Sequence, residues 1–305
     1  MPHARARGTR QGLAAICALA AGGTLLAACG GGSPAAAPHT VSSAPARPTA
    51  TFPAPSGLVA GAQAQPDGTM WLLADTDGTA TLQELDLSTR KILAIVPESA
   101  SAHSLAQSPS GLLAVGLATA TTGAVELRNG SSGAIVATVP VGAPVEGLAA
   151  GADGSTLYVL DGSSSSSSVT LVNLETDRAS VSVPVPLATV SIAVQPTERD
   201  IYALTASGKV DEIDVGTGAV TASFPVGPDP LQLAISSTGS TLYVLRRAGG
   251  GTNVGVVQLA TERQTRAFAA PANCLGIQLS AGGRHIYDVV GTSRYGNVQV
   301  FPTGT

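Results

Sequence analysis

Between residues 48 and 305, short runs of alternating apolar and polar residues are separated by turns rich in Gly, Pro, Ser and Thr. Such alternation predicts half-buried β-strands. The turns recur at near-constant spacing, because those that start at Gln65, Ser108, Gly151, Gln195, Ser236 and Ser280 are 43, 43, 44, 41 and 44 residues apart. The pattern therefore predicts six repeated units.

Each unit divides into four strands, most clearly in the fifth, where we expect strands at 231–235, 241–245, 253–259 and 265–269. Four strands in a period of 40 to 45 residues are typical of a propeller blade, which covers its faces by stacking on its neighbours. Four of the five tyrosines lie four residues after the last residue of their turn, and Leu72 and Val115 take that position in the first two units. We expect an all-β fold, a six-bladed β-propeller of four-stranded antiparallel blades.

The two ends of this region predict how the ring closes. The last unit stops after its third strand, at 297–301, whereas an extra strand-like segment, 49–53, precedes the first unit and resembles the outer strand of the fourth, 221–225. A ring of blades must close or leave an exposed strand edge. We therefore expect 49–53 to pair with 297–301 as the outer strand of the last blade.

The repeats resemble a known family. The segments 154–159 (GSTLYV) and 240–244 (STLYV), together with the link 139–144 (VPVGAP), are similar to YVTN-type β-propeller repeats, which are found in secreted and cell-surface proteins. The resemblance covers nearly all of 48–305 and implies the fold. Blades 1 and 2 depart from the pattern, with Trp71-Leu72 and Ala114-Val115 in place of the Tyr-Val pair. It implies little about function, because the family includes surface proteins, binding modules and relatives of lactonases and quinoprotein subunits.

The first 28 residues are typical of a secretory signal peptide. Three arginines precede an apolar stretch, 12–28, that ends in Leu26-Ala27-Ala28-Cys29. This ending resembles a bacterial lipobox, which implies cleavage before Cys29 and a lipid on its thiol. Residues 29–47 are rich in Gly, Pro, Ala and Ser, as expected of a flexible tether. The domain organisation that we predict is a signal peptide at 1–28, a lipid-anchored tether at 29–47 and the propeller at 48–305.

Composition excludes some functional classes. Charged residues make up only 12% of the 305 residues, and without the signal peptide 13 basic residues stand against 20 acidic ones, a net charge near −7. Such a chain would be repelled by nucleic acid. Of the three cysteines, only Cys274 would remain as a free thiol, so no intramolecular disulfide can form.

The inner strand of each blade should line the central channel. One set of alternate positions on these strands is small and neutral, and we expect its polar members to face the channel: Gln63, Ser104, Ser191, Gln232 and Gln278. The intervening apolar set, which includes Leu105 and Ile277, belongs between blades. Because no ionisable residue falls in the channel set, neither a metal site nor a cofactor site is expected there.

One step nearer the mouth of the channel, we expect a ring of Ala60, His103, Glu146, Val190, Leu231 and Leu275. His103 and Glu146 take equivalent positions on adjacent blades, where a carboxylate could orient an imidazole base. They are the only candidates for catalysis, and the interpretation that we favour is that both are solvated loop residues. Cys274 is either a reactive thiol or, as we favour, a small buried residue.

Three functional hypotheses remain. The favoured one is a lipid-anchored, non-enzymatic module on the extracytoplasmic side of a bacterial cell envelope that binds a protein, peptide or glycan. The second is an enzyme of the propeller lactonase or hydrolase type that uses His103 and Glu146. The third is a structural envelope protein. The sequence leaves open the identity of the partner, the face that binds, the oligomeric state and whether the membrane is the outer membrane of a Gram-negative cell or the surface of a Gram-positive one.

Overall fold

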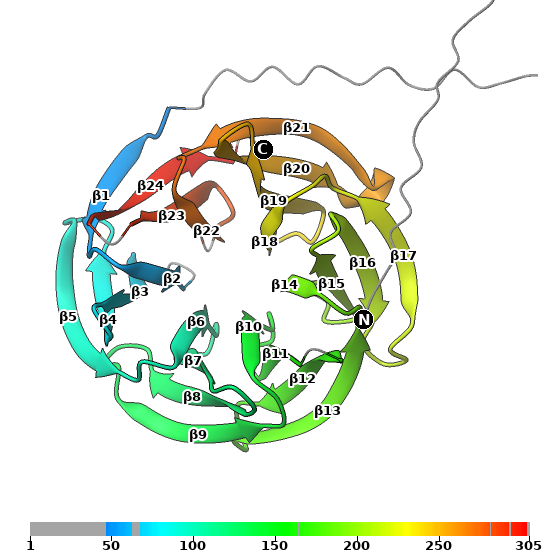
Figure 1. Cartoon of the computed structure of the whole chain (residues 1–305), viewed down its shortest axis with the longest axis horizontal. Coiled ribbons are helices and arrows are strands. Elements are labelled where there is room, and N and C mark those ends of the chain that lie inside the picture. The colour runs from blue at the N-terminus through cyan, green and yellow to red at the C-terminus, as the bar shows by residue number, and fades with distance from the viewer. Residues whose placement is uncertain (1–46, 63–67, 164, 281, 293, 304–305) are drawn as a thin grey trace, which may run out of the picture. The chain divides into compact units, whose positions relative to one another are not determined.

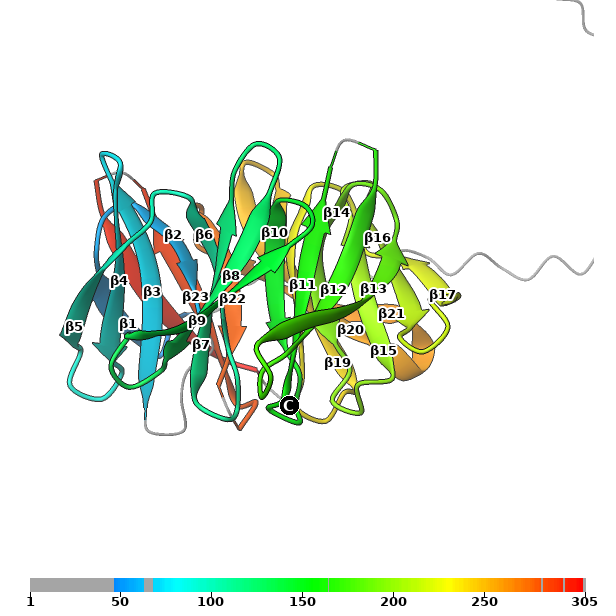
Figure 2. The same ribbon diagram turned by 90° about the horizontal axis from the view of Figure 1, so that it is seen from below.

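A computed structural model describes residues 47–62, 68–163, 165–280, 282–292 and 294–303. In this part of the chain, 24 strands form six four-stranded antiparallel sheets. Figure 1 shows the sheets arranged as blades around a central axis, and Figure 2 shows the same ring from the side, with loops at both faces. The prediction of a six-bladed propeller is confirmed.

The blades are numbered along the chain, and the strands of each are given from the channel outward. Blade 1 contains β2 (Leu58–Gly61), β3 (Thr69–Thr76), β4 (Thr79–Asp86) and β5 (Lys91–Glu98). Blade 2 contains β6 (Ala102–Gln107), β7 (Leu112–Ala118), β8 (Gly123–Asn129) and β9 (Ile135–Val141). Blade 3 contains β10 (Val145–Ala150), β11 (Thr156–Gly162), β12 (Ser167–Asn173) and β13 (Arg178–Val185).

Blade 4 contains β14 (Thr189–Val194), β15 (Asp200–Thr205), β16 (Lys209–Asp214) and β17 (Val220–Pro225). Blade 5 contains β18 (Pro230–Ile235), β19 (Thr241–Ala248), β20 (Gly251–Gln258) and β21 (Arg263–Ala270), with a short 3-10 helix, Leu259–Thr261, before β21. Blade 6 contains β22 (Cys274–Leu279), β23 (His285–Gly291), β24 (Gly296–Pro302) and, outermost, β1 (Ala50–Ala54).

The ring closes through β1, as the sequence predicts. β1 is antiparallel to β24, with Thr51 opposite Gln299 and Phe52 opposite Val298. The backbone N–H of Thr49 extends the pairing by donating to the carbonyl of Val300 at 2.8 Å. Because β1 and β24 come from opposite ends of the propeller, this pairing joins the first blade to the last (Figure 1).

The hydrophobic core is divided among the seams between blades. Six clusters of buried side chains are present in the described residues, and each cluster joins two neighbouring blades. In the seam between blades 5 and 6, for example, Leu245 and Val256 pack with Ile277 and Ile286. Burial of apolar surface in these seams is what holds each blade to the next.

The register of blades 1 and 2 differs by one residue from our expectation. Opposite the inner strand, the position of Tyr158 in blade 3 is taken by Trp71 in blade 1 and Ala114 in blade 2, as the pairs Trp71-Leu72 and Ala114-Val115 predict. The count of four residues from the turn, which gives Leu72 and Val115, was wrong by one residue. In blade 2 the cause is a shorter turn, since Ser108 N–H donates to the carbonyl of Leu112, four residues on. The equivalent hydrogen bond in blade 3 spans five residues, from Gly151 to Thr156.

Trp71 fills its position as a structural side chain. It is fully buried, and its indole N–H donates to the carbonyl of Gly130 in blade 2 at 2.7 Å.

Among the residues that the structure describes, no helix has the length and apolar character needed to cross a membrane.

Candidate binding site at the channel mouth

Every inner strand contains a β-bulge at the same place. The register with the second strand shifts between Leu58 and Ala60 in blade 1, between Ala102 and Ser104 in blade 2, and at the equivalent point in the other four blades. A bulge leaves one residue unpaired and redirects its side chain. The six bulge residues, which we call the mouth ring, are Val59, His103, Glu146, Val190, Leu231 and Leu275.

The mouth ring matches our expectation in five blades and differs in blade 1. There Leu58 pairs with Ala74 and Ala60 pairs with Leu73, so the unpaired residue is Val59 and not Ala60. The bulge depends on backbone hydrogen bonding and not on the residue type, which is why the alternation of side chains alone did not locate it. The change replaces a methyl group in the ring by a larger apolar side chain.

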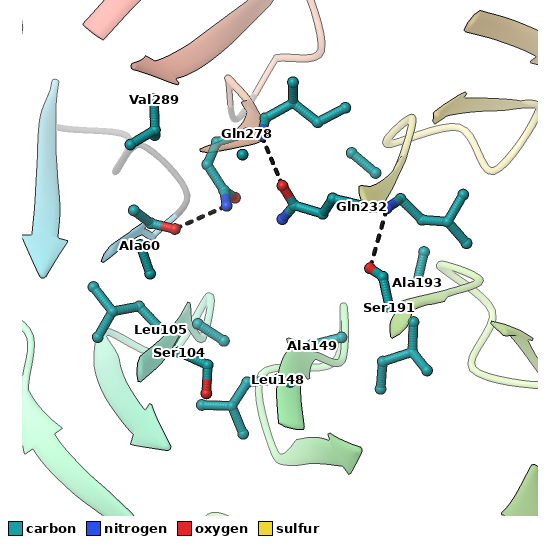
Figure 3. A pocket seen from close by; sticks show the side chains of 18 of the residues that line it. Ala60, Ser104, Leu105, Leu148, Ala149, Ser191, Ala193, Gln232, Gln278 and Val289 are labelled. Carbon is teal, nitrogen blue, oxygen red and sulfur yellow. Dashed lines mark hydrogen bonds between the residues drawn. The ribbon is translucent and has the colours of Figure 1, made fainter. Parts of the chain in front are cut away.

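All six mouth-ring residues line one central cavity of about 330 Å³. Figure 3 looks into this cavity and shows side chains from the inner strands around it. Both sets of alternate positions take part, because Ser191 and Gln232 contribute to the lining together with Leu105 and Ile277. The inner strands therefore present their edges to the channel, and their two faces lie against the neighbouring blades.

Three of the polar residues that we expected in the channel join adjacent blades. The Ser191 Oγ accepts a hydrogen bond from the backbone N–H of Leu233 at 3.1 Å, across the seam between blades 4 and 5. The Oε1 of Gln232 accepts from the N–H of Ile277 at 2.7 Å, across the next seam. The Nε2 of Gln278 donates to the carbonyl of Gly61 at 2.8 Å and so joins blade 6 to blade 1 (Figure 3).

The remaining polar residues of that expected set differ from these three. Ser104 also lines the cavity, but its Oγ is buried and has no hydrogen-bond partner among the described residues. Gln63, which we placed on the channel wall, lies outside the described residues, as does Cys29.

The two glutamine amides have defined orientations. A backbone N–H can only donate and a carbonyl can only accept, so these partners fix which side-chain atom of each amide is oxygen and which is nitrogen. The Nε2 of Gln232 and the Oε1 of Gln278 have no partner among the described residues, and Figure 3 shows both side chains directed into the cavity. The wall therefore offers one donor and one acceptor from adjacent blades.

His103 is held by backbone groups. Its Nδ1 lies 3.0 Å from the carbonyl oxygen of Gly116, and its Nε2 is in hydrogen-bond contact with the carbonyl oxygen of Val145 in blade 3. Carbonyl oxygens only accept, so each ring nitrogen can bond its partner only as an N–H donor. In this orientation both ring nitrogens are directed at backbone carbonyls, and neither is directed at the cavity as a base or a metal ligand.

Glu146 is the exposed ionisable group of the ring. Its carboxylate makes no hydrogen bond or ion pair with any described residue, although it lies on the blade next to His103. Partial burial raises its pKa, the charge of Asp161 raises it further, and His103 opposes both. Asp161 itself is buried and accepts a hydrogen bond from the Thr170 hydroxyl at 2.6 Å. The structure thus brings His103 and Glu146 close together without joining them as an acid–base pair.

The other chemical candidates are placed as follows. No group of three or more His, Cys, Asp or Glu residues in the described part of the chain is arranged to hold a metal ion. Cys274 is buried at the start of β22, where burial and the nearby Asp288 raise the pKa of its thiol.

Comparison with known proteins bears on the fold. No family model matches the chain, and no curated protein matches it. Among solved structures, the chain is similar to one described as Kuenenia stuttgartiensis hydrazine synthase, with a TM-score of 0.59 and 16% sequence identity over 81% of this chain and 87% of that one. At this level of identity the similarity concerns the architecture alone, and the sheets of this chain form a six-bladed β-propeller.

Proposed function

We propose that this protein is a lipid-anchored, non-enzymatic binding module on the extracytoplasmic side of a bacterial cell envelope, and that its working surface is the mouth ring. The observation that carries the proposal is the composition of the ring. Val59, Val190 and Leu275 are 37%, 37% and 42% exposed, and they gather around one cavity. Exposed apolar side chains that gather at a concave site favour recognition of a partner.

The anchoring part of the proposal rests on the sequence alone. The lipobox-like segment 26–29 precedes a tether of 29–47, which would let the propeller reach partners at some distance from the membrane. Replacement of Cys29 by Ala should abolish incorporation of labelled palmitate and release the protein from the membrane fraction. If Cys29→Ala retains both the label and the membrane location, the lipid anchor is excluded.

The binding surface can be tested in intact cells by cross-linking of the full chain. Val190→Asp places a charge in the mouth ring, and Val181→Asp places the same charge on outer strand β13, where Val181 is 60% exposed. Both valines are exposed, so both variants should fold. We expect Val190→Asp to reduce cross-linked partner at least fivefold and Val181→Asp to leave it unchanged. Equal cross-linking by wild type and by Val190→Asp would exclude the mouth ring as the working surface.

The alternative is a lactonase-like or hydrolase-like enzyme with His103 and Glu146 at the channel mouth. Its support is that these two residues lie on adjacent blades and line the same cavity. A panel of lactones and esters, with and without Ca²⁺, should be screened with the wild type and with the double replacement His103→Ala, Glu146→Ala. A rate above background that the double variant loses would establish the enzyme and overturn the binding proposal.

A further inference from the structure

The mouth ring is chemically two-sided. Val190, Leu231, Leu275 and Val59 belong to blades 4, 5, 6 and 1, which are consecutive around the ring, so their aliphatic side chains form one continuous arc. His103 and Glu146 of blades 2 and 3 complete the circle. In a ring of six blades, blade 3 lies opposite blade 6 (Figure 1), so Glu146 stands across the mouth from Leu275.

The two sides of the mouth ring favour different chemical groups of a ligand. The aliphatic arc is partly exposed, and an apolar side chain placed against it would remove that surface from water. The Glu146 carboxylate has no partner among the described residues, and it would form a charge-assisted hydrogen bond with an ammonium or guanidinium group. His103 does not compete for that group, since its ring nitrogens already contact backbone carbonyls.

The wall of the cavity matches a peptide backbone. A peptide residue carries one N–H donor and one C=O acceptor. The free Nε2 of Gln232 can donate to the carbonyl, and the free Oε1 of Gln278 can accept from the N–H. Both amides are held in place by their contacts with the backbone of the next blade, so little ordering is needed when a ligand arrives.

Size and geometry limit the ligand further. A cavity of about 330 Å³ is at the lower end of the range for ligand pockets, so it suits a few residues and not a folded domain. In an extended peptide, successive side chains point in opposite directions. An aliphatic residue directed at the arc therefore places its sequence neighbour toward Glu146.

We propose that the mouth ring binds a short extended peptide segment in which an aliphatic residue is adjacent to a lysine or arginine. The inference rests on the proposed function, because it assigns the class of partner that the same mouth ring recognises.

The test is a titration of the full chain with fluorescent tetrapeptides. The probe is acetyl-Ala-Leu-Lys-Ala-amide, and the matched peptides replace Leu by Ser or Lys by Glu. We expect each replacement to weaken binding about tenfold, and we expect binding of the probe to weaken as salt is added. An oligosaccharide panel serves as the competing class.

Variants of the protein locate the contact. Glu146→Gln removes the charge and keeps the shape, and we expect it to weaken the Lys peptide about tenfold and to bind the Glu peptide as well as the Lys peptide. Glu175→Gln is the matched control, since Glu175 is exposed in the turn after β12, outside the mouth ring. It should bind as the wild type does.

The outcomes separate the two proposals. Equal affinity of wild type and Glu146→Gln for the Lys peptide, or binding of oligosaccharides but not of peptides, would overturn the peptide assignment. If the peptide assignment fails while Val190→Asp still reduces cross-linking to the partner, the binding function stands and only the proposed ligand class is wrong. If Val190→Asp also cross-links normally, both proposals fail.

Discussion

Blade 4 and blade 6 have the same four-stranded architecture and differ in how they are assembled. The four strands of blade 4 follow one another in the chain, from Thr189 to Pro225. Blade 6 takes three strands from the C-terminal end and its outer strand, β1, from the N-terminal side of the propeller. Pairing within blade 6 must therefore close the whole ring, and loop closure over a longer stretch of chain costs more entropy.

The two blades also differ at one buried position. Ala203 of blade 4 and Asp288 of blade 6 occupy the same place on the second strand, opposite Ile192 and Ile277 of the inner strands. The other four blades have apolar residues there: Leu72, Val115, Val159 and Val244. Asp288 is fully buried against the apolar seam with blade 5, and neither of its carboxylate oxygens has a hydrogen-bond partner among the described residues.

A third difference concerns the channel. Ser191 of blade 4 accepts a hydrogen bond from blade 5, whereas blade 6 has Gly276, with no side chain, at the equivalent position. The first two differences act in one direction, because each lowers the stability of blade 6 relative to blade 4. The third is offset, because Gln278 of blade 6 donates a hydrogen bond to Gly61 of blade 1. The comparison teaches that repeated blades need not be equally stable, and it identifies blade 6 as the part of the ring that should open first.

The largest loss of unfolding free energy should come from a substitution in the outer strand of a blade. Phe52 of β1 and Phe224 of β17 occupy equivalent positions, opposite Val298 and Val210, and they are 5% and 3% exposed. Replacement of Phe224 by Ala should cost about 3–5 kcal/mol of unfolding free energy, as for other buried phenylalanines. Phe52→Ala should cost more, because it also weakens the closure of the ring. Urea denaturation measures both changes.

Alkylation of Cys274 gives a local readout of the same comparison. This buried thiol of blade 6 should react slowly in the wild type, since burial raises its pKa and limits access. Phe52→Ala should accelerate the reaction strongly under native conditions, and Phe224→Ala should do so much less. Equal acceleration by the two variants would mean that blade 6 does not open before blade 4.

The second prediction concerns the pH dependence caused by Asp288. Burial raises the pKa of this carboxyl to about 7 in the folded protein, against an ordinary value near 3.8. The folded state therefore binds more protons than the unfolded state between these values, and stability falls as pH rises from about 4 to about 7. A difference of about three units corresponds to roughly 4 kcal/mol. Within the apolar cluster of this seam, Cys274 and Tyr243 are the titratable members, and both remain neutral over this range.

Variants of Asp288 separate titration from packing. Asp288→Asn keeps the shape and should remove this pH dependence, and Asp288→Val should also raise stability above pH 7. Val244→Asp is the reverse experiment, because it should give blade 5 the same loss of stability with rising pH. Urea denaturation at pH 5 and pH 8 measures each effect. The stability change of Asp288→Asn between pH 5 and pH 8 gives the contribution of all other groups. If the wild type loses no more stability than this variant over the same range, Asp288 is not a buried, protonated carboxyl.

The sequence was sufficient for the fold because the fold depends on repetition. Six copies of a turn at a spacing of about 43 residues specify the number of blades, and the spare strand at 49–53 specifies the closure. Single-residue register was harder to predict, since the turn of blade 2 is one residue shorter than that of blade 3. A shift of one residue moves a side chain to the other face of its strand, which is how Val59 of blade 1 was missed.

The site was predicted less completely than the fold. Alternation along a strand identifies Gln232 and Gln278 as candidates for the channel, but it cannot show that each amide reaches the backbone of the next blade. The same holds for His103, whose contacts with Gly116 and Val145 come from two blades. Partners distant in sequence decide whether a polar group is free to bind, and a single sequence does not contain that information.

The smallest loss of stability among these predictions should come from replacement of Ser191. Ser191→Gly gives blade 4 the residue of blade 6 at this position, and it removes the acceptor for the N–H of Leu233. Loss of a buried hydrogen bond of this kind costs about 1 kcal/mol. Ser191→Ala isolates this contribution from the added backbone freedom of glycine. Ser104→Ala is the matched control in blade 2, where the Oγ is buried without a partner, and it should be neutral or slightly stabilising.

The result decides how the blades are held together near the channel. If Ser191→Ala and Ser104→Ala have equal effects, the hydrogen bond to Leu233 adds nothing to the seam, and the difference between blades 4 and 6 reduces to ring closure and Asp288. If only Ser191→Ala is destabilising, polar contacts at the channel edge reinforce the apolar seams, and the seams that lack them are where further substitutions should have their greatest effect.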